Sequence, residues 1–537
     1  KYYWAPNIDS IYSHWKNRVM NDWNDSLLSF SGIMNGGLKG RELCLINKTS
    51  KAKKIIRLLL SGQTMYLLAN TQLLTYADDE NTRRFFNDFR VSKEETASPI
   101  LGNNSDKLFA ALQSKDSATF QQAYNALSEV QFIEKDIALL MDRAIQQYPA
   151  NENIYQSVNE KLLSLVEALL EKDSSATNKV KVNTFIQENY NKSNKNIDSL
   201  RFYLLGLAAK NKTSESYQLI RELLAAKKHA ADYNYRFFGK LYDSLELTRT
   251  LYPDLLNYIS DTTMDLAIVS LTKAMIDSNL LTVDILLPIK TQLIKLAKKQ
   301  VKFINSGEYG FTYEIPDLIE LLGYFKQKDA DDVAATFLKA KEIFVKKSAA
   351  LTLIKNNRPV AASVLFRIAN DQQYRVSLFE GLKKAGKEKL FPADLRSQVG
   401  LAEGYIFNAV FDEEEDETVP EMIFIKRVEY NYKGAKKAFY IFRANYEYKM
   451  EDGDEVIDST AQLLSPDATP KTDATTTTES YLTVAGPFDL NKGELMIDEK
   501  ENISGMWYDD KFDGMKIDYY FRKYIERWVK WQEEQKK

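Results

Sequence analysis

Few residues of this chain are of the types that carry the commonest enzymatic chemistry. His14 and His229 are its two histidines, and Cys44 is its one cysteine. These counts exclude zinc sites built from Cys and His, CxxC redox pairs and intrachain disulfides, because each needs more such residues than the chain has. Neither histidine lies near a nucleophile motif, so we expect no Cys-His or Ser-His-Asp centre.

Carboxylates are the remaining candidates for catalysis. The chain has 75 Asp and Glu residues, and a pair of carboxylates can hydrolyse a glycosidic bond without a histidine. The sequence does not show which two would face each other across a cleft. We therefore assign no catalytic residue, and a carboxylate-dependent hydrolase acting on polysaccharide is the alternative to a non-catalytic function.

Two acidic segments could bind a cation. The run from Asp412 to Glu417 lacks the alternating ligands and central glycine of an EF-hand loop, which favours a solvated linker. The segment from Asp509 to Gly514 has the composition of an ordinary surface turn. We predict no metal ion and no cofactor.

The overall composition favours a folded protein that does not bind nucleic acid. Lys and Arg number 72 and nearly balance the acidic residues, and no segment has the basic density that a phosphate backbone requires. The longest apolar runs, such as Ile55–Leu60, are far shorter than the roughly 20 residues of a membrane-spanning helix, so no transmembrane segment is expected. The first residue is Lys1 rather than Met, which predicts a removed or absent N-terminal segment that could associate the protein with a membrane.

Residues 1–92 mix helical and strand patterns, which predicts an α+β module. Apolar residues between Ile8 and Asn24 recur at helical spacing, and Asp79–Phe89 predicts a closing helix. Short apolar runs separated by glycines predict an antiparallel sheet. Its expected strands are Arg41–Asn47, Ile55–Leu60 and Thr64–Asn70.

Part of this module resembles the PsbP-like modules of exported bacterial proteins. The segments that carry the resemblance are Gly40–Glu42, Met65–Leu68 and Arg84–Phe89. Asp88 stands where the family usually has Ser, and the first strands of the family's module are missing or lie upstream of Lys1, so the module is expected to be truncated. The resemblance implies an extracytoplasmic protein, in the periplasm or at the cell surface, with a binding or assembly role.

Residues 106–411 carry a nearly continuous helical period broken by short polar stretches. Ile343–Lys355 is the clearest helix, because Asn356–Pro359 after it is a strong stop signal. Three similar segments each end one helix and precede another, and the spacing of the last two fits three units of about 39 residues. These segments are Phe109–Asp116, Leu205–Lys212 and Leu322–Asp329. The region therefore resembles irregular HEAT-like helical repeats, which stack into a solenoid; an irregular bundle is the alternative.

Residues 419–537 predict an antiparallel β-rich domain with a closing helix. Alternating residues predict a hairpin around Lys433-Gly434. The tract Asp458–Ser480 is rich in Thr, Pro and Asp, which predicts an exposed loop. The expected strands are Met422–Tyr432, Ala438–Lys449, Tyr481–Ala485 and Glu494–Asp498, with a turn at Gly486-Pro487 and the closing helix at Met515–Gln532.

The predicted architecture is multidomain and mainly α, and its longest part is a repeat scaffold. Such scaffolds commonly present extended surfaces to proteins or peptides. Together with the PsbP-like resemblance, this predicts a non-catalytic scaffold or protein-binding component of a bacterial cell envelope. Its expected partners are proteins, including those of a membrane-associated complex. The alternative is the carboxylate-dependent hydrolase, acting on envelope polysaccharide.

The scarcity of histidine makes one prediction directly. Replacement of His14 and His229 by Gln should leave folding intact and should weaken capture of protein partners by less than tenfold, or about 1.4 kcal/mol. The measurement is an affinity pull-down beside a melting curve. Loss of the partners at an unchanged melting temperature would contradict the prediction.

Overall fold

The computed structural model divides into two compact units, residues 1–255 and 256–537, and each is described by itself. The structure describes residues 8–20, 25–47, 50, 52–62, 64–73, 80–91, 104–149, 154, 156–172, 175–192, 195–226, 235–306, 313–411, 420–449, 476–491, 493–507 and 517–535. The boundary between the units falls within the predicted region 106–411. The three predicted domains stay a prediction about which parts fold independently.

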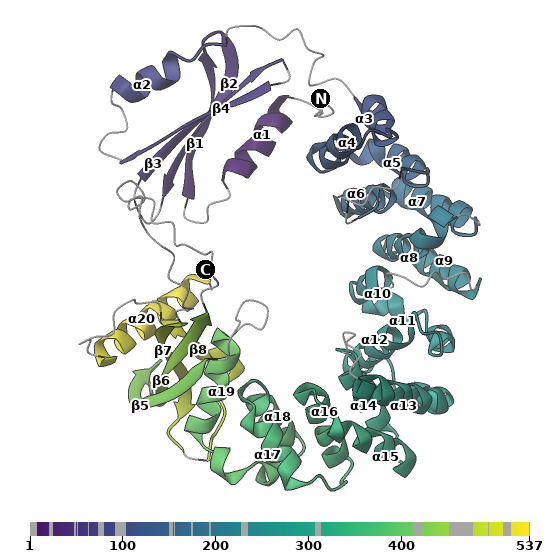
Figure 1. The fold of residues 1–537 in the computed structure, drawn as a ribbon, viewed down its shortest axis with the longest axis vertical. Coiled ribbons are helices and arrows are strands. Elements are labelled where there is room, and N and C mark those ends of the chain that lie inside the picture. The colour runs from purple at the N-terminus through teal and green to yellow at the C-terminus, as the bar shows by residue number, and fades with distance from the viewer. Residues whose placement is uncertain are drawn as a thin grey trace, which may run out of the picture. The chain divides into compact units, whose positions relative to one another are not determined.

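The first unit opens with a four-stranded antiparallel sheet between two helices (Figure 1). The elements are α1 (Ile8–Val19), β1 (Asp25–Asn35), β2 (Leu38–Asn47), β3 (Ala52–Ser61), β4 (Thr64–Leu73) and α2 (Glu80–Asn87). Tyr12 of α1 packs on Leu43 and Leu58, whereas Arg57, which points the other way, lies over Phe86 of α2. The α+β module is confirmed, and β1 is an edge strand that the sequence prediction did not include.

Helices occupy the rest of the first unit and most of the second. Those of the first unit are α3 (Ser105–Leu112), α4 (Ser117–Glu129), α5 (Ile137–Ala144), α6 (Val158–Lys172), α7 (Ala176–Tyr190), α8 (Lys195–Lys210), α9 (Ser214–Ala225), α10 (Tyr235–Tyr242) and α11 (Leu245–Arg249). Those of the second are α12 (Asp265–Asp277), α13 (Lys290–Ser306), α14 (Ile315–Tyr324), α15 (Lys328–Thr336), α16 (Ile343–Lys355), α17 (Ala362–Asn370), α18 (Gln372–Lys384) and α19 (Gln398–Val410). The three similar segments do end α3, α8 and α14, and the helices α4, α9 and α15 follow them.

Within the second unit the helices stack in two rows (Figure 1). α12, α14, α16 and α18 contact one another in succession, and α13, α15 and α17 pack beside them. After α12, α16 and α18 the chain turns through a left-handed residue: Asn279 (φ 58°), Asn357 (φ 55°) and Gly386 (φ 66°). The next N–H then donates to the carbonyl five residues earlier at 2.8–2.9 Å. The mainly helical character of this region is confirmed, and the repeated ending agrees with helical repeats. The HEAT-type period stays a prediction.

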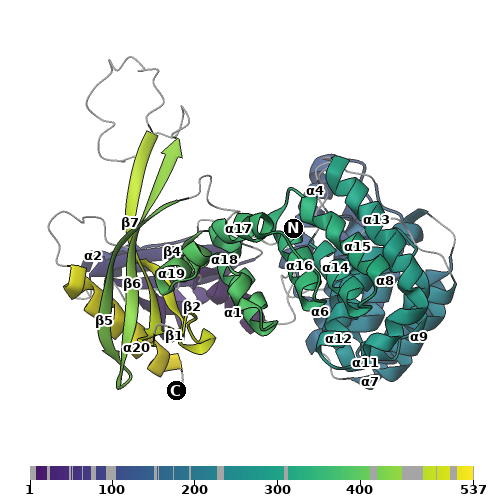
Figure 2. The same ribbon diagram turned by 90° about the horizontal axis from the view of Figure 1, so that it is seen from below.

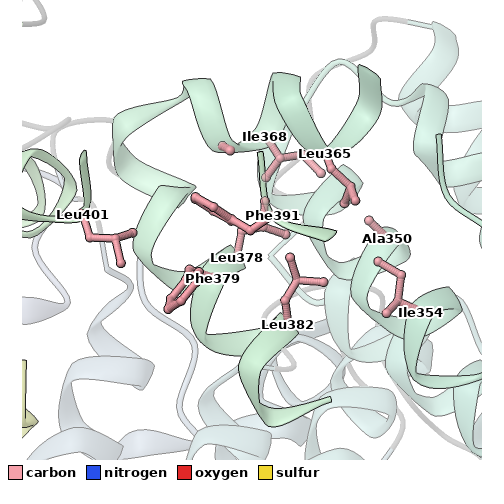
Figure 3. Packing of buried hydrophobic residues seen from close by; sticks show 10 residues of the cluster. Ala350, Ile354, Leu365, Ile368, Leu378, Phe379, Leu382, Phe391 and Leu401 are labelled. Atoms are coloured by element: carbon pink, nitrogen blue, oxygen red, sulfur yellow. The ribbon is translucent and has the colours of Figure 1, made fainter. Parts of the chain in front are cut away.

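An apolar core joins the last repeat helices, from α16 to α19. Figure 3 shows side chains from α16, α17, α18 and α19 converging between the helices. The buried members are Ala350, Ile354, Leu365, Ile368, Ala369, Leu378, Phe379, Leu382, Phe391 and Leu401. No single helix pair could bury these faces alone, so each repeat depends on its neighbours for stability.

The second unit ends in a four-stranded antiparallel sheet with one helix on each face. The elements are β5 (Glu421–Tyr432), β6 (Ala435–Lys449), β7 (Thr476–Asp489), β8 (Ile503–Trp507) and α20 (Ile517–Gln535). Tyr440 and its face pack against α19, and Phe439 and its face pack against α20. Figure 2 shows both helices beside the strands. Lys433 (φ 50°) and Gly434 (φ 81°) form the predicted hairpin turn. The β-rich domain with its closing helix is confirmed.

Two predicted breaks in this sheet are wrong. Gly486 and Pro487, joined by a cis peptide bond, lie inside β7 rather than at a turn. A register shift opposite them, between Ala438 and Tyr440, accommodates the proline, which cannot donate a ladder hydrogen bond. Thr476–Ser480 is also strand rather than loop, because it pairs with the end of β6. Residues 458–475 of the predicted loop lie outside the described residues.

The predicted strand Glu494–Asp498 is wrong as well. This segment is irregular, and the last strand is β8. Its apolar residues gave a strand-like pattern because Leu495 and Met496 pack against the helical core and Ile497 is buried against α19. Burial against helices and burial in a sheet give similar patterns over so few residues.

A substitution at Gly323 of α14 tests how closely this helix packs against α16. A Cβ at Gly323 would lie 2.5 Å from Cγ2 of Thr352 on α16, so Gly323→Ala should destabilise the protein by about 1–3 kcal/mol, seen as a lower thermal unfolding midpoint. Gly239→Ala on α10 is the matched control, since nothing lies within 4 Å of a Cβ there. It should be neutral or stabilising by up to about 1 kcal/mol. Equal effects would contradict the packing argument.

Candidate functional site

The structure does not bring together in one site the described residues that the sequence offered as candidates. His14 Nε2 on α1 lies 3.2 Å from Glu129 Oε2 on α4, an interhelical contact. Cys44 is a free thiol on β2. His229, the acidic run 412–417 and the turn 509–514 lie outside the described residues. Among the described residues, no three His, Cys, Asp or Glu side chains come together as metal ligands would.

A stripe of polar residues instead runs across the helix row of the second unit. α12, α14, α16 and α18 are buried on most sides and leave partly exposed positions at spacings of three and four residues. We call this stripe the polar ladder. Its residues are Ser270, Lys273, Asp277, Asp317, Glu320, Tyr324, Lys347, Tyr374, Ser377 and Glu380.

Direct polar contacts link α12 to α14, and we call each such contact between neighbouring helices a rung of the ladder. Ser270 Oγ donates to Asp317 Oδ2 at 2.5 Å, and Lys273 Nζ lies 3.1 Å from Glu320 Oε2. In each of these two pairs, the residues lie 47 positions apart in the sequence. Burial raises the pKa of Asp317, against the lowering effects of the Ser270 hydrogen bond and the Lys273 charge.

Lys347 forms the rung between α16 and α18. Its ammonium donates to Ser377 Oγ at 2.9 Å and lies 5.1 Å from the centre of the Tyr374 ring. Burial lowers the pKa of Lys347, and the charges of Glu320 and Glu380 oppose this shift. Lys347 is therefore a partly desolvated cation whose charge is stabilised by Glu320 and Glu380, and its contacts with Ser377 and Tyr374 hold its position.

Similar cation–aromatic rungs occur in the first unit. Lys161 of α6 lies 4.1 Å from the ring centre of Tyr124 on α4, and Arg236 of α10 lies 5.0 Å from that of Tyr203 on α8. Burial lowers the pKa of Lys161. The pairing of a cation on one helix with a tyrosine on a neighbouring one thus recurs along the repeats.

A cavity of about 520 Å³ adjoins Glu380, the last rung of the ladder. It lies among α18, α19 and the irregular segment before β8. The lining residues are Val376, Glu380, Tyr405, Asn408, Ala409, Met496, Ile497, Asp498 and Asn502. The lining combines apolar side chains with two carboxylates, two carboxamides and a phenol, and it includes no basic side chain.

Buried polar contacts hold the walls of this cavity. Arg375 of α18 is 3% exposed and donates to the carbonyls of Ala369 (2.8 Å) and Gly400 (3.0 Å) and to Glu403 Oε2 (2.6 Å). On the opposite wall, the backbone N–H of Ile497 donates to Tyr405 Oη at 3.3 Å. These hydrogen bonds link α18 to α19, and α19 to the irregular segment.

Comparison of the chain with protein-family models, with curated proteins and with solved structures found no match. The PsbP-like and HEAT-like resemblances therefore stay predictions. In the part of the chain that the structure describes, no helix is both long and apolar enough to cross a membrane, in agreement with the expected absence of a transmembrane segment.

Asp317 gives the ladder a testable pH dependence. Because the pKa of Asp317 is raised on folding, the folded protein binds this proton more tightly than the unfolded chain, and stability falls as pH rises above about 4. Asp317→Asn should therefore unfold at higher denaturant than the wild type at pH 7, and the difference should shrink toward pH 4. Asp332→Asn, at an exposed position on α15, is the control and should show no such trend. A difference independent of pH would contradict this role of Asp317.

Proposed function

We propose that this protein is a non-catalytic scaffold that binds protein partners along the polar ladder. The observation that carries the proposal is the arrangement of charged and aromatic groups on four successive helices of one row, with Lys347 at its centre. Fixed polar groups beside aromatic rings are typical of protein-recognition surfaces. Four neighbouring helices offer such a surface to an extended segment of a partner.

The location in a bacterial cell envelope belongs to the same proposal. It rests on the PsbP-like resemblance of Gly40–Glu42, Met65–Leu68 and Arg84–Phe89. In that setting the partners are proteins of the envelope, including those of a membrane-associated complex.

The polysaccharide hydrolase is the second candidate, because Glu380 and Asp498 line one cavity with Tyr405. A glycosidase acid is commonly surrounded by apolar groups that keep it protonated. Glu380 instead lies 2.9 Å from Lys384 Nζ at a partly exposed position, and exposed Asp498 accepts from the backbone N–H of Lys500 at 3.0 Å. These contacts favour binding over hydrolysis.

A pull-down with charge-matched variants tests the scaffold. Glu320→Gln with Lys347→Gln removes one negative and one positive charge from the ladder, and should reduce capture of partners from envelope fractions at least about tenfold. Lys298→Gln with Asp332→Asn removes the same charges from exposed positions on α13 and α15 and should leave capture unchanged. Partners are identified by mass spectrometry, and melting curves confirm that both variants fold.

Equal capture by the two double variants would refute the ladder as the binding surface. Release of reducing ends from envelope polysaccharide by the wild type, and its loss in Glu380→Gln, would favour the hydrolase instead.

A further inference from the structure

The cavity at the end of the ladder has a composition that selects among ligands. Its apolar lining includes Val376, Met496 and Ile497, and its two carboxylates are Glu380 and Asp498. An uncharged apolar ligand would offer those two carboxylates no hydrogen-bond donor and no positive charge. A metal ion would need a further ligand, and among the described residues no such cluster occurs. The complementary ligand has an apolar stem and a positive end.

We propose that this cavity receives a lysine or arginine side chain from an extended segment of the protein partner. Such side chains bury an aliphatic stem on apolar surface while the cationic end stays near water and acceptors. The inference rests on the proposed function, since it identifies the chemistry of the partner that the ladder binds.

Each part of the lining has a role in this recognition. The aliphatic stem packs on Val376 and Ile497, and the cationic end meets the carboxylates of Glu380 and Asp498. The Tyr405 ring adds a surface that attracts cations. Asn408 and Asn502 offer carboxamides that can hydrogen-bond the backbone of an extended segment.

The carboxylates keep acceptor capacity for such a ligand. Asp498 precedes the short helix η8 (Glu499–Glu501) and one of its oxygens accepts the Lys500 N–H, but a carboxylate offers about four acceptor sites. Lys384 approaches Glu380 from outside the lining and is itself 72% exposed, so this ion pair is weak. The cavity volume of about 520 Å³ is within the range of ordinary ligand sites.

The test uses two probes, the peptides acetyl-Ala-Lys-Ala-amide and acetyl-Ala-norleucine-Ala-amide. Norleucine has the stem of lysine without the ammonium group. Saturation-transfer NMR on the full chain should detect the lysine peptide, with a signal about tenfold stronger than that of the norleucine peptide. Equal signals, or none from the lysine peptide, would overturn the proposal.

Two double variants locate the binding. Glu380→Gln with Asp498→Asn should abolish the lysine signal, and the fold should persist because Asn is also a good N-cap and the lost ion pair is exposed. Asp394→Asn with Glu494→Gln removes two exposed carboxylates outside the lining and should keep the signal. Equal loss in both variants would mean general surface attraction and would refute the cavity.

The ladder variant separates this inference from the proposed function. Glu320→Gln with Lys347→Gln leaves both cavity carboxylates in place and should still bind the lysine peptide. If the wild type binds the lysine peptide but the ladder variant and its control capture partners equally, the ladder proposal fails and lysine binding in the cavity stands. If the ladder variant loses capture as expected, but the cavity variant binds the lysine peptide as well as the wild type does, only the cavity inference fails.

Discussion

Close packing of α12, α14, α16 and α18 on one another controls the chemistry of the second unit. These helices are buried on most sides, and at Gly323 and Gly381 the neighbouring helix α16 comes so near that a Cβ would lie 2.5 Å from one of its side chains. What remains of each helix surface is a stripe too narrow to hydrate a charge fully. Polar groups on the stripe must therefore find partners on the adjacent helix.

The contacts of the ladder follow from this constraint. Lys273 and Lys347 each have carboxylates nearby, and Asp317 accepts a hydroxyl hydrogen bond. Burial works against both signs of charge, raising the pKa of Asp317 and lowering that of Lys347. The result is a surface whose groups are already positioned, so binding of the proposed partner would cost little conformational entropy.

α19 joins the repeats to the C-terminal sheet. Its residues Leu401 and Ala402 lie in different cores, the first with the repeat helices and the second with the sheet. Buried Gln398 donates to the carbonyls of Asp489 and Glu494, both at 2.7 Å, and accepts from Tyr440 Oη at 2.8 Å. The cavity lies beside this joint, which explains why its walls come from helices and an irregular segment together.

The sequence by itself determined the elements whose signals are local. The helix Ile343–Lys355 matches α16 at both ends because its stop signal follows directly, and the hairpin turn at Lys433-Gly434 needs only two residues with positive φ. Tertiary structure decided the rest. Only packing shows that Ile497 is buried in an irregular segment rather than in a paired strand, and that Pro487 lies within β7. The ladder and the cavity unite residues dozens of positions apart, such as Ser270 with Asp317 and Glu380 with Asp498, and no local pattern encodes such distances because they depend on how each helix packs on the next.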